Sequence, residues 1–220
     1  SARALGHISQ FSMGSDMADV DGDGHLDIFV ADMAASDNYR QKTLMKSMNI
    51  ERFRRYVEHG FQHQYMFNTL QLNRGDGTFS EVGQLAGVAR TDWSWAALFA
   101  DLDNDGDNDL LVTNGRRKAA SHVDYQNYKS QVIQANGGRP DLPVLRQMLD
   151  KLEDDAPVQN RAFRNDGGVS FSVIQKEWGL DATTTSNGAA YGDLDGDGDL
   201  DLVVNNIEEL VSVYVNQSTG

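Results

Sequence analysis

Three short acidic segments constrain this chain of 220 residues more than any other feature. They read DVDGDGHLD (19–27), DLDNDGDND (101–109) and DLDGDGDLD (193–201), so each follows the pattern D-x-D-x-D-G-x-x-D. Asp supplies 26 of the 33 acidic side chains, an excess that suits turns and caps better than helix interiors. A lone Asp-Gly pair usually marks a solvated turn, but three copies that each keep four acids and one glycine indicate a shared chemical role.

The spacing within these segments predicts three calcium sites. Carboxylates at positions 1, 3, 5 and 9 provide the oxygen ligands that a hard divalent cation prefers, and the glycine at position 6 permits the sharp bend. Position 7 is expected to contribute its backbone carbonyl only, so its side chain can vary. The predicted ligands are Asp19, Asp21, Asp23, His25 (carbonyl) and Asp27; Asp101, Asp103, Asp105, Asp107 (carbonyl) and Asp109; and Asp193, Asp195, Asp197, Asp199 (carbonyl) and Asp201.

The residues that follow each acidic segment argue against an EF-hand. An EF-hand loop leads into a helix and carries a bidentate Glu at position 12. In this chain position 12 is Val30, Val112 or Val204, and the following runs are rich in β-branched residues. The acidic loops are therefore expected to join β-strands.

The sequence around the loops also repeats. Residues 68 to 109 match a second copy displaced by 92 residues, in which Asn73 aligns with Asn165 and Phe79 aligns with Phe171. Once the extra residues of the first two copies are removed, each unit has about 50 residues, with room for four short strands. Four strands in a repeat of this length favour the blade of a β-propeller.

On these residues the chain resembles the FG-GAP/VCBS repeats, the integrin-α-like calcium propellers, and among them the cartilage-acidic-protein-like branch. The segments MADVDGDGHLDIFVAD, FADLDNDGDNDLLVTNG and YGDLDGDGDLDLVVNN resemble its calcium hairpin, and NRGDGTFSEVGQLAGV resembles its second hairpin. The resemblance implies a mainly β fold, a partial β-propeller of about three four-stranded blades with the third incomplete. It also implies that calcium lies in the loop between the first two strands of each blade.

The repeat boundaries divide the chain into three blades that together form one propeller fragment. We expect a first blade over 1–92, a second over 93–184 and an incomplete third over 185–220. The first two blades carry insertions, at about 33–67 and about 115–159.

Both insertions have helical patterns. The first has near-helical apolar spacing over 41–60, including Met45 and Met48, and Gly60 suits its end. The second has two patterns, over 121–138 and 142–155. These helices are expected either to cover exposed blade edges or to form a partner site.

The charge distribution limits the possible partners. A net charge of −14 opposes binding to nucleic acid, and the insertions are net basic while the rest of the chain is strongly acidic. No apolar run approaches the roughly 20 residues of a membrane-spanning helix, so membrane insertion is not expected. The chain has no cysteine, which excludes disulfides and thiolate metal sites.

Two functions from different classes fit these patterns. The first is a non-catalytic, calcium-binding propeller segment that binds a protein or glycan in adhesion. The second is the propeller portion of a hydrolase or lyase, with its active site on the propeller face or in an accompanying domain. A purely structural spacer is a third possibility. No nucleophile elbow, phosphate-binding glycine loop or ordered catalytic triad is present, so no catalytic residue is assigned.

Location and assembly follow from the same features. Sites of this type suit millimolar extracellular calcium, and the resemblance implies an extracellular, cell-surface or periplasmic protein, although SARALGHISQ is not a signal sequence. Open blade edges in an incomplete propeller also favour self-association.

Three smaller motifs each have two interpretations. His59 and His63 are four residues apart and could share a zinc ion, or they could be solvated side chains at a helix end. The tripeptide at 74–76 spells Arg-Gly-Asp, but a hairpin turn explains it equally well. Trp93 and Trp95 precede a blade strand, where packing is favoured over stacking on a sugar.

Overall fold

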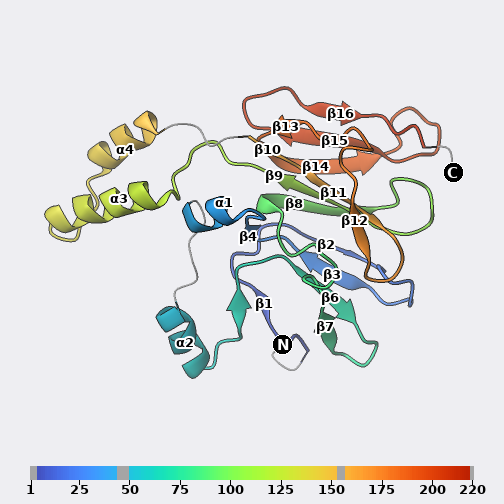
Figure 1. Cartoon of the computed structure of the whole chain (residues 1–220), viewed down its shortest axis with the longest axis horizontal. Helices are drawn as coiled ribbons and strands as arrows, with labels where there is room; N and C mark the ends of the chain where they lie inside the picture. The colour runs from blue at the N-terminus through green and yellow to red at the C-terminus, as the bar shows by residue number, and fades with distance from the viewer. Residues whose placement is uncertain (1–3, 44–49, 153–156, 219–220) are drawn as a thin grey trace.

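The protein is described by a computed structural model that covers residues 4–43, 50–152 and 157–218. Three antiparallel sheets lie side by side, and their strands run in roughly the same direction across the molecule (Figure 1). The helices gather at one end of these strands (Figure 1). This arrangement confirms the predicted mainly β fold of three successive sheets with helical insertions.

The first sheet has four strands in the order β2-β3-β6-β7. Neighbouring strands are antiparallel, and the acidic segment 19–27 forms the connection between the first two. The strands are β2 (Ser15–Ala18), β3 (Asp27–Val30), β6 (Thr69–Asn73) and β7 (Phe79–Glu81).

The second sheet has one strand more than expected. Its order is β12-β11-β9-β8-β4, and the additional strand β4 comes from the start of the first insertion. Met33 of β4 pairs with Trp93 of β8, so the first insertion is attached to the second sheet as well as the first. The strands are β4 (Met33–Ala34), β8 (Asp92–Ala100), β9 (Asp109–Asn114), β11 (Arg161–Asn165) and β12 (Phe171–Val173).

The third sheet has three strands in the order β14-β15-β16, consistent with the incomplete third blade. These strands are β14 (Ser186–Gly192), β15 (Asp201–Asn206) and β16 (Ser212–Tyr214). Two short pairs supplement the sheets. The strand β1 (Ile8–Ser9) pairs with β5 (Gln64–Tyr65), and β10 (Val158–Gln159) pairs with β13 (Thr183–Thr184).

The predicted helical segments form four helices within the described residues. In the first insertion, Gly60 has φ +84° after the second helix, and the Phe61 N–H donates to the Tyr56 carbonyl, which ends that helix as expected. Met45 and Met48 lie outside the described residues. The helices are α1 (Asn38–Thr43), α2 (Ile50–Glu58), α3 (Val123–Ala135) and α4 (Leu142–Lys151).

Local capping explains the bounds of the two later helices. The Asp141 carboxylate accepts from the Val144 N–H and begins α4, while Gly137 and Gly138, both with positive φ, follow the end of α3. Among the described residues, no helix is long and apolar enough to cross a membrane.

The core consists of two apolar layers, each between neighbouring sheets. The first layer joins residues of the first sheet, such as Phe29 and Leu70, to Phe99 and Phe163 of the second. The other layer joins the second sheet to the third. Because apolar burial is the main favourable contribution to folding, the sheets stabilise one another face to face. This packing fixes the three acidic loops at a common end.

Candidate metal centres

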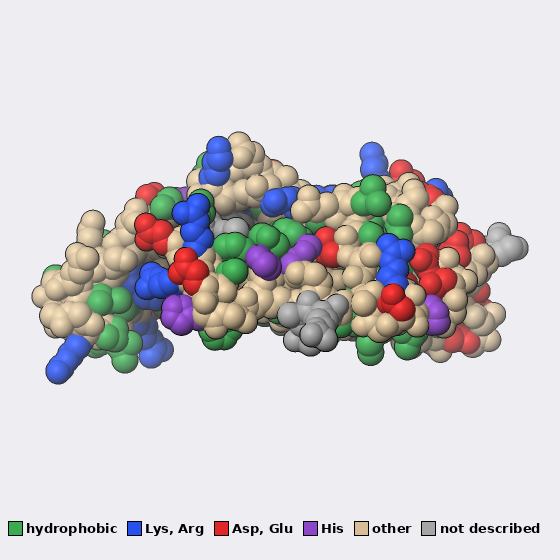
Figure 2. All heavy atoms as spheres, turned by 90° about the horizontal axis from the view of Figure 1, so that it is seen from below, with side chains coloured by type: hydrophobic (Ala, Val, Ile, Leu, Met, Phe, Trp, Pro, Cys, Tyr) green, Lys and Arg blue, Asp and Glu red, His purple; other side chains and the backbone are tan. Residues whose placement is uncertain are grey.

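The three acidic loops lie at the same end of the stacked sheets. They connect β2 to β3, β8 to β9 and β14 to β15, and all three are on the right in Figure 1, away from the helices. Figure 2 shows acidic side chains gathered most densely at this same end. The acidic side chains that dominate the composition are therefore concentrated at one end of the sheets.

Within each loop, carboxylate oxygens from three Asp residues converge to within 4.8 Å of one another. In the first two loops the converging residues are at positions 1, 3 and 9, whereas in the third they are at positions 1, 3 and 5. The three groups are Asp19, Asp21 and Asp27; Asp101, Asp103 and Asp109; and Asp193, Asp195 and Asp197. The structure thus brings together three of the four predicted carboxylates in each loop, and the position 7 carbonyls remain a prediction.

The acid at position 9 also holds the loop to its sheet. In all three copies it is fully buried, and each of its two oxygens accepts a backbone N–H. One N–H comes from position 2 of the same loop, and the other comes from an Asn at the end of the third strand (Asn73 and Asn165) or two residues after it (Asn216). The distances are 2.9 and 2.8 Å for Asp27, 2.9 and 2.9 Å for Asp109, and 2.8 and 2.7 Å for Asp201.

The acid at position 1 accepts backbone N–H groups across the turn. Asp19 accepts from the amides at positions 5 and 6, at 3.1 and 2.8 Å, and Asp101 repeats this at 3.1 and 3.0 Å. Asp193 differs, because its Oδ1 accepts from Gly196 at position 4 instead. This difference accompanies the altered convergence in the third loop.

Position 4 is a backbone requirement that the sequence analysis missed. Gly22, Asn104 and Gly196 have φ values of +72°, +61° and +81°. Only Gly adopts this conformation without strain, and Asn tolerates it better than most other residues. The alternation of Gly, Asn and Gly at this position was visible in the sequence and could have identified it.

Four of the acids in the loops have raised pKa values. Burial, followed by the nearby charges of Asp103 and Asp105, raises the pKa of Asp109 to about 7. Burial is also the first cause of the raised pKa values of Asp27, Asp103 and Asp195, and neighbouring carboxylates add to it. A cation placed among these oxygens opposes both the desolvation and the repulsion.

The donor set fits a hard divalent ion. Each group contains carboxylates only, without His or Cys, which matches calcium better than zinc. In the second loop the Asp103 Oδ1 atom is buried and has no hydrogen-bond partner among the described residues. A buried carboxylate oxygen of this kind costs free energy unless a donor or cation reaches it.

Comparison with known families supports the same assignment of the repeat. A family model described as an FG-GAP-like repeat matches residues 57–112 and 138–204, more than half of the chain. The chain belongs to the FG-GAP-like repeat family. No curated protein matches the sequence.

The Asn at the end of the third strand links neighbouring FG-GAP repeats. The Asn165 side chain donates to the carbonyl of Asn108 in its own loop, at 3.3 Å, and to that of Val20 in the preceding loop, at 2.9 Å. Asn216 repeats both bonds, to Leu200 at 3.3 Å and Leu102 at 2.8 Å. The alignment of Asn73 with Asn165 in the sequence did not predict the bonds to Val20 and Leu102, because these partners lie in another repeat.

The other end of the FG-GAP strands has a buried network of uncharged side chains. Ser94 donates to the Asn114 Oδ1 atom at 2.8 Å, and the Asn114 backbone N–H donates to Asn160 at 2.8 Å. Asn160 donates to Ser186 of the third sheet at 3.0 Å, and Ser186 donates to Asn206 at 2.8 Å. The network therefore runs from the second sheet to the third without a carboxylate.

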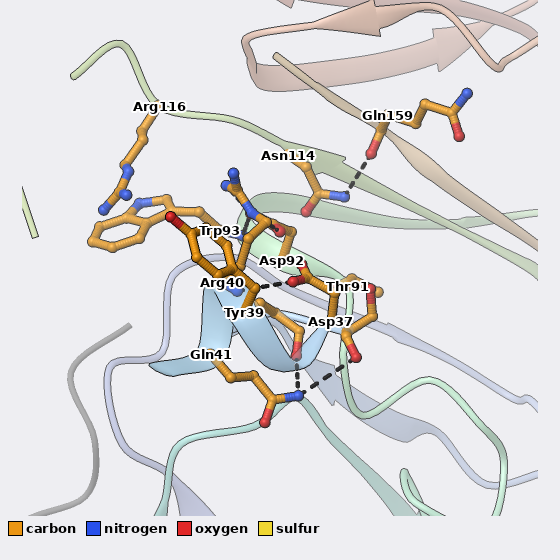
Figure 3. A network of polar contacts seen from close by, with 12 residues as sticks. Asp37, Tyr39, Arg40, Gln41, Thr91, Asp92, Trp93, Asn114, Arg116 and Gln159 are labelled. Carbon is orange, nitrogen blue, oxygen red and sulfur yellow. Dashed lines mark hydrogen bonds and ion pairs between the residues drawn. The ribbon is translucent and has the colours of Figure 1, made fainter. Parts of the chain in front are cut away.

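Figure 3 shows how the insertions attach to this end of the FG-GAP fold. Arg40 of α1 forms a bidentate ion pair with Asp92, with N–O distances of 2.7 and 2.8 Å. Asp92 has φ +108°, a strained conformation that the ion pair and its contact with the Trp93 N–H hold in place. Arg116, where the second insertion begins, stacks 4.5 Å from the centre of the Trp93 ring (Figure 3).

The remaining motifs have structural roles. The Asp76 carboxylate accepts from the Thr78 N–H and hydroxyl, which stabilises the hairpin turn at 74–76. Trp95 donates to the Gly115 carbonyl, and Trp93 packs against Arg116. Among the described residues, neither His59 nor His63 belongs to a cluster of three metal-ligating side chains.

Proposed function

We propose that this chain is a non-catalytic, calcium-binding β-propeller module of an exported or cell-surface protein, and that it binds a protein or a glycan. The convergence of three Asp carboxylates in each of three equivalent loops carries the proposal. The FG-GAP repeat family is generally non-catalytic and typical of extracellular or surface proteins, which supports the role and the location.

Burial and repulsion within the loops support calcium as a structural ion. The position 9 acids are buried beside other carboxylates, and the raised pKa values of Asp27 and Asp109 report the cost of placing charge there. Bound calcium supplies positive charge that offsets this cost. Millimolar calcium outside the cell suits open sites with few protein ligands.

The residues themselves determine where such an ion is held. The position 9 carboxylate fixes the loop to the third strand, and in the first two loops the positive-φ residues at positions 4 and 6 turn the chain so that positions 1 and 3 face position 9. The Asn at or just after the end of the third strand then connects each loop to the preceding one. Occupation of the loops is therefore expected to stiffen the stack of sheets.

We place the recognition surface on the helical insertions. These helices lie at the end opposite the acidic loops (Figure 1), so a partner bound there does not compete with the ions. The insertions carry a net positive charge on a chain with a net charge of −14, which favours an acidic protein or glycan.

Calcium titration tests the metal proposal. Isothermal titration calorimetry of the metal-free chain should give three sites, and Asp21→Asn, Asp103→Asn and Asp195→Asn should each remove one. Calcium should raise the melting temperature, and excess EDTA should lower it. Asp181→Asn changes an exposed acid outside the loops and serves as the matched control.

Two results contradict the metal proposal. One is an unchanged melting temperature after verified removal of all metal. The other is a loop variant that binds as many calcium ions as the control variant.

Replacement of the second insertion tests the recognition surface. The short connection between β15 and β16 spans residues 207–211. A copy of it can replace residues 115–160 between β9 and β11, which removes α3 and α4. The shortened chain should keep three calcium sites and lose binding on an array of acidic glycans. Retained glycan binding with intact calcium stoichiometry contradicts this location for the site.

A further inference from the structure

Two asparagines each touch two acidic loops at once. The first, Asn165 at the end of β11, is buried, and both polar atoms of its side chain make hydrogen bonds. Its Oδ1 atom accepts from the Gly167 N–H at 3.0 Å, which fixes the orientation of the amide. Its Nδ2 atom then donates to Asn108 in the second loop at 3.3 Å and to Val20 in the first loop at 2.9 Å.

The same asparagine also holds a carboxylate of the second loop. The Asn165 backbone N–H donates to the Asp109 Oδ1 atom at 2.9 Å. In the first loop, the Val20 N–H donates to the Asp27 Oδ2 atom at 2.9 Å. A continuous series of hydrogen bonds therefore joins the buried position 9 acids of the first two loops, in the order Asp27, Val20, Asn165 and Asp109.

Asn216 forms the equivalent bridge between the second and third loops. Its Oδ1 atom accepts from the Ser218 N–H at 3.0 Å, and its Nδ2 atom donates to the Leu102 carbonyl at 2.8 Å. Its backbone N–H donates to the Asp201 Oδ1 atom at 2.7 Å. The Leu102 N–H donates to the Asp109 Oδ2 atom at 2.9 Å, so Asp109 belongs to both bridges.

Side chains of the second loop reinforce both bridges. Asn108 donates to the Asp19 carbonyl of the first loop at 3.1 Å, and Asn104 donates to the Asp199 carboxylate of the third loop at 2.8 Å. Within residues 4–43, 50–152 and 157–218, no hydrogen bond joins the first loop directly to the third. The second loop is therefore bonded to both of its neighbours, and these neighbours are not bonded to each other.

Ordering one loop should make it easier to order the next. A cation held by one loop restricts its position 9 carboxylate and the residues bonded to that carboxylate. Through Asn165 or Asn216, this restriction extends to the adjoining loop. Because restricting a segment costs conformational entropy, a loop that is already ordered by its neighbour loses less entropy when it binds its own ion.

We propose that Asn165 and Asn216 are positioning residues that couple adjacent metal loops, so that calcium in one loop raises the calcium affinity of the next. This inference rests on the calcium sites of the proposed function. It assigns coupling to neighbouring loops only, because the bridges join the second loop to the first and to the third. Within a coupled pair, each ion should raise the affinity of the other loop about five- to tenfold.

Calorimetry on chains with one or two intact loops tests this coupling. D195N keeps the first and second loops, D21N keeps the second and third, and D103N keeps the first and third. The coupling factor is the overall constant for two ions divided by the product of the constants measured in chains with a single intact loop. It should be about five to ten for D195N and D21N, and about one for D103N, the matched control with two loops that no bridge joins.

Removal of each bridge tests its assignment to one pair of loops. In the D195N chain, Asn165→Ala should lower the coupling factor at least about twofold, and in the D21N chain it should leave the factor unchanged. Asn216→Ala should have the reverse effect, so each variant is the control for the other.

Hydrogen exchange in EDTA tests the bridges without metal. N165A should speed the exchange of the Val20 amide in the first loop and leave that of Leu102 unchanged, because only the Val20 carbonyl loses its donor. N216A should speed the exchange of the Leu102 amide and leave that of Val20 unchanged.

Two results overturn the inference and leave the calcium sites intact. One is a coupling factor near one in both D195N and D21N. The other is a factor in D103N as large as in those two chains. A wild-type chain that binds no calcium overturns the inference together with the proposed function. The comparison of D195N, D21N and D103N keeps both asparagines, so it does not depend on the folding of N165A or N216A.

Discussion

The buried polar groups at the two ends of the stacked strands differ in charge and in how their hydrogen bonds are satisfied. At the helical end, Ser94, Asn114 and Asn160 pair donors with acceptors and carry no charge. At the loop end, each loop concentrates carboxylates, which can only accept, and one buried oxygen of Asp103 has no partner in the part of the chain that the structure describes. The first network is complete within the protein, whereas the second needs positive charge from outside. The repeat therefore combines a structural end with an end suited to metal binding.

The largest loss of stability is expected at position 9 of the second loop, where Asp109 both holds the loop to its sheet and belongs to the acidic cluster. Asp109→Ala leaves the buried N–H groups of Leu102 and Asn165 without an acceptor, and it should lower the free energy of unfolding by about 2–4 kcal/mol. Urea denaturation in EDTA measures this loss without any contribution from calcium. Asp107→Ala, an exposed change in the same loop, is the control, and an equal loss in both variants contradicts the prediction.

A substitution in the uncharged network at the helical end should give the next largest loss of stability, and calcium should not change the size of this loss. Asn114→Ala removes the acceptor of Ser94 and a donor to the Gln159 carbonyl, so it should cost about 2 kcal/mol. The loss should be the same with calcium and with EDTA, in urea denaturation curves. Asn205→Ala, on the same strand as Asn206 but exposed, is the control. A loss that appears only in calcium indicates coupling between the two ends.

Asp32 is a charged exception at the neutral end, at the place in the repeat that Asn114 and Asn206 occupy. Its buried carboxylate accepts from the backbone N–H groups of Gln10 and Phe11, and burial raises its pKa. The folded state then binds the proton more tightly than the unfolded state does. The contribution of Asp32 is fully present below about pH 4 and is lost as the pH rises through the raised pKa.

Asp32→Asn should flatten this part of the pH profile. The wild-type free energy of unfolding should fall relative to that of the variant as the pH rises above about 4. Urea denaturation at a series of pH values measures the difference, and Asp181→Asn, an exposed acid, serves as control. Parallel profiles for wild type and D32N contradict the prediction.

The smallest loss of stability is expected for substitutions at position 4 of the second loop. Asn104 has φ +61° and donates to the Asp199 carboxylate at 2.8 Å, which connects the second and third loops. Asn104→Ala should cost about 1 kcal/mol, because it adds backbone strain and removes that bond. Asn104→Gly removes the bond but relieves the strain, so thermal melts should show a loss below about 0.5 kcal/mol. Equal losses would mean that strain has no part in the effect.

Local patterns predicted the acidic loops, the strands beside them and most of the helices. The four acids and the glycine lie within nine residues, so their spacing alone indicates a turn that gathers oxygens. The bonds of Asn165 to Val20 and of Arg40 to Asp92 were not predictable, because residues far apart in the sequence meet only after folding. The pairing of β4 with β8 was missed for the same reason.

The position of the insertions has a consequence for the order in which the strands assemble. In the third repeat only residues 207–211 separate β15 from β16, whereas residues 31–68 separate β3 from β6, and 115–160 separate β9 from β11. Closing the longest of these connections costs about 2 kcal/mol more chain entropy than closing the shortest. The hairpin β15–β16 is thus favoured as an early local structure, and the sheets interrupted by helices are expected to complete their pairing later.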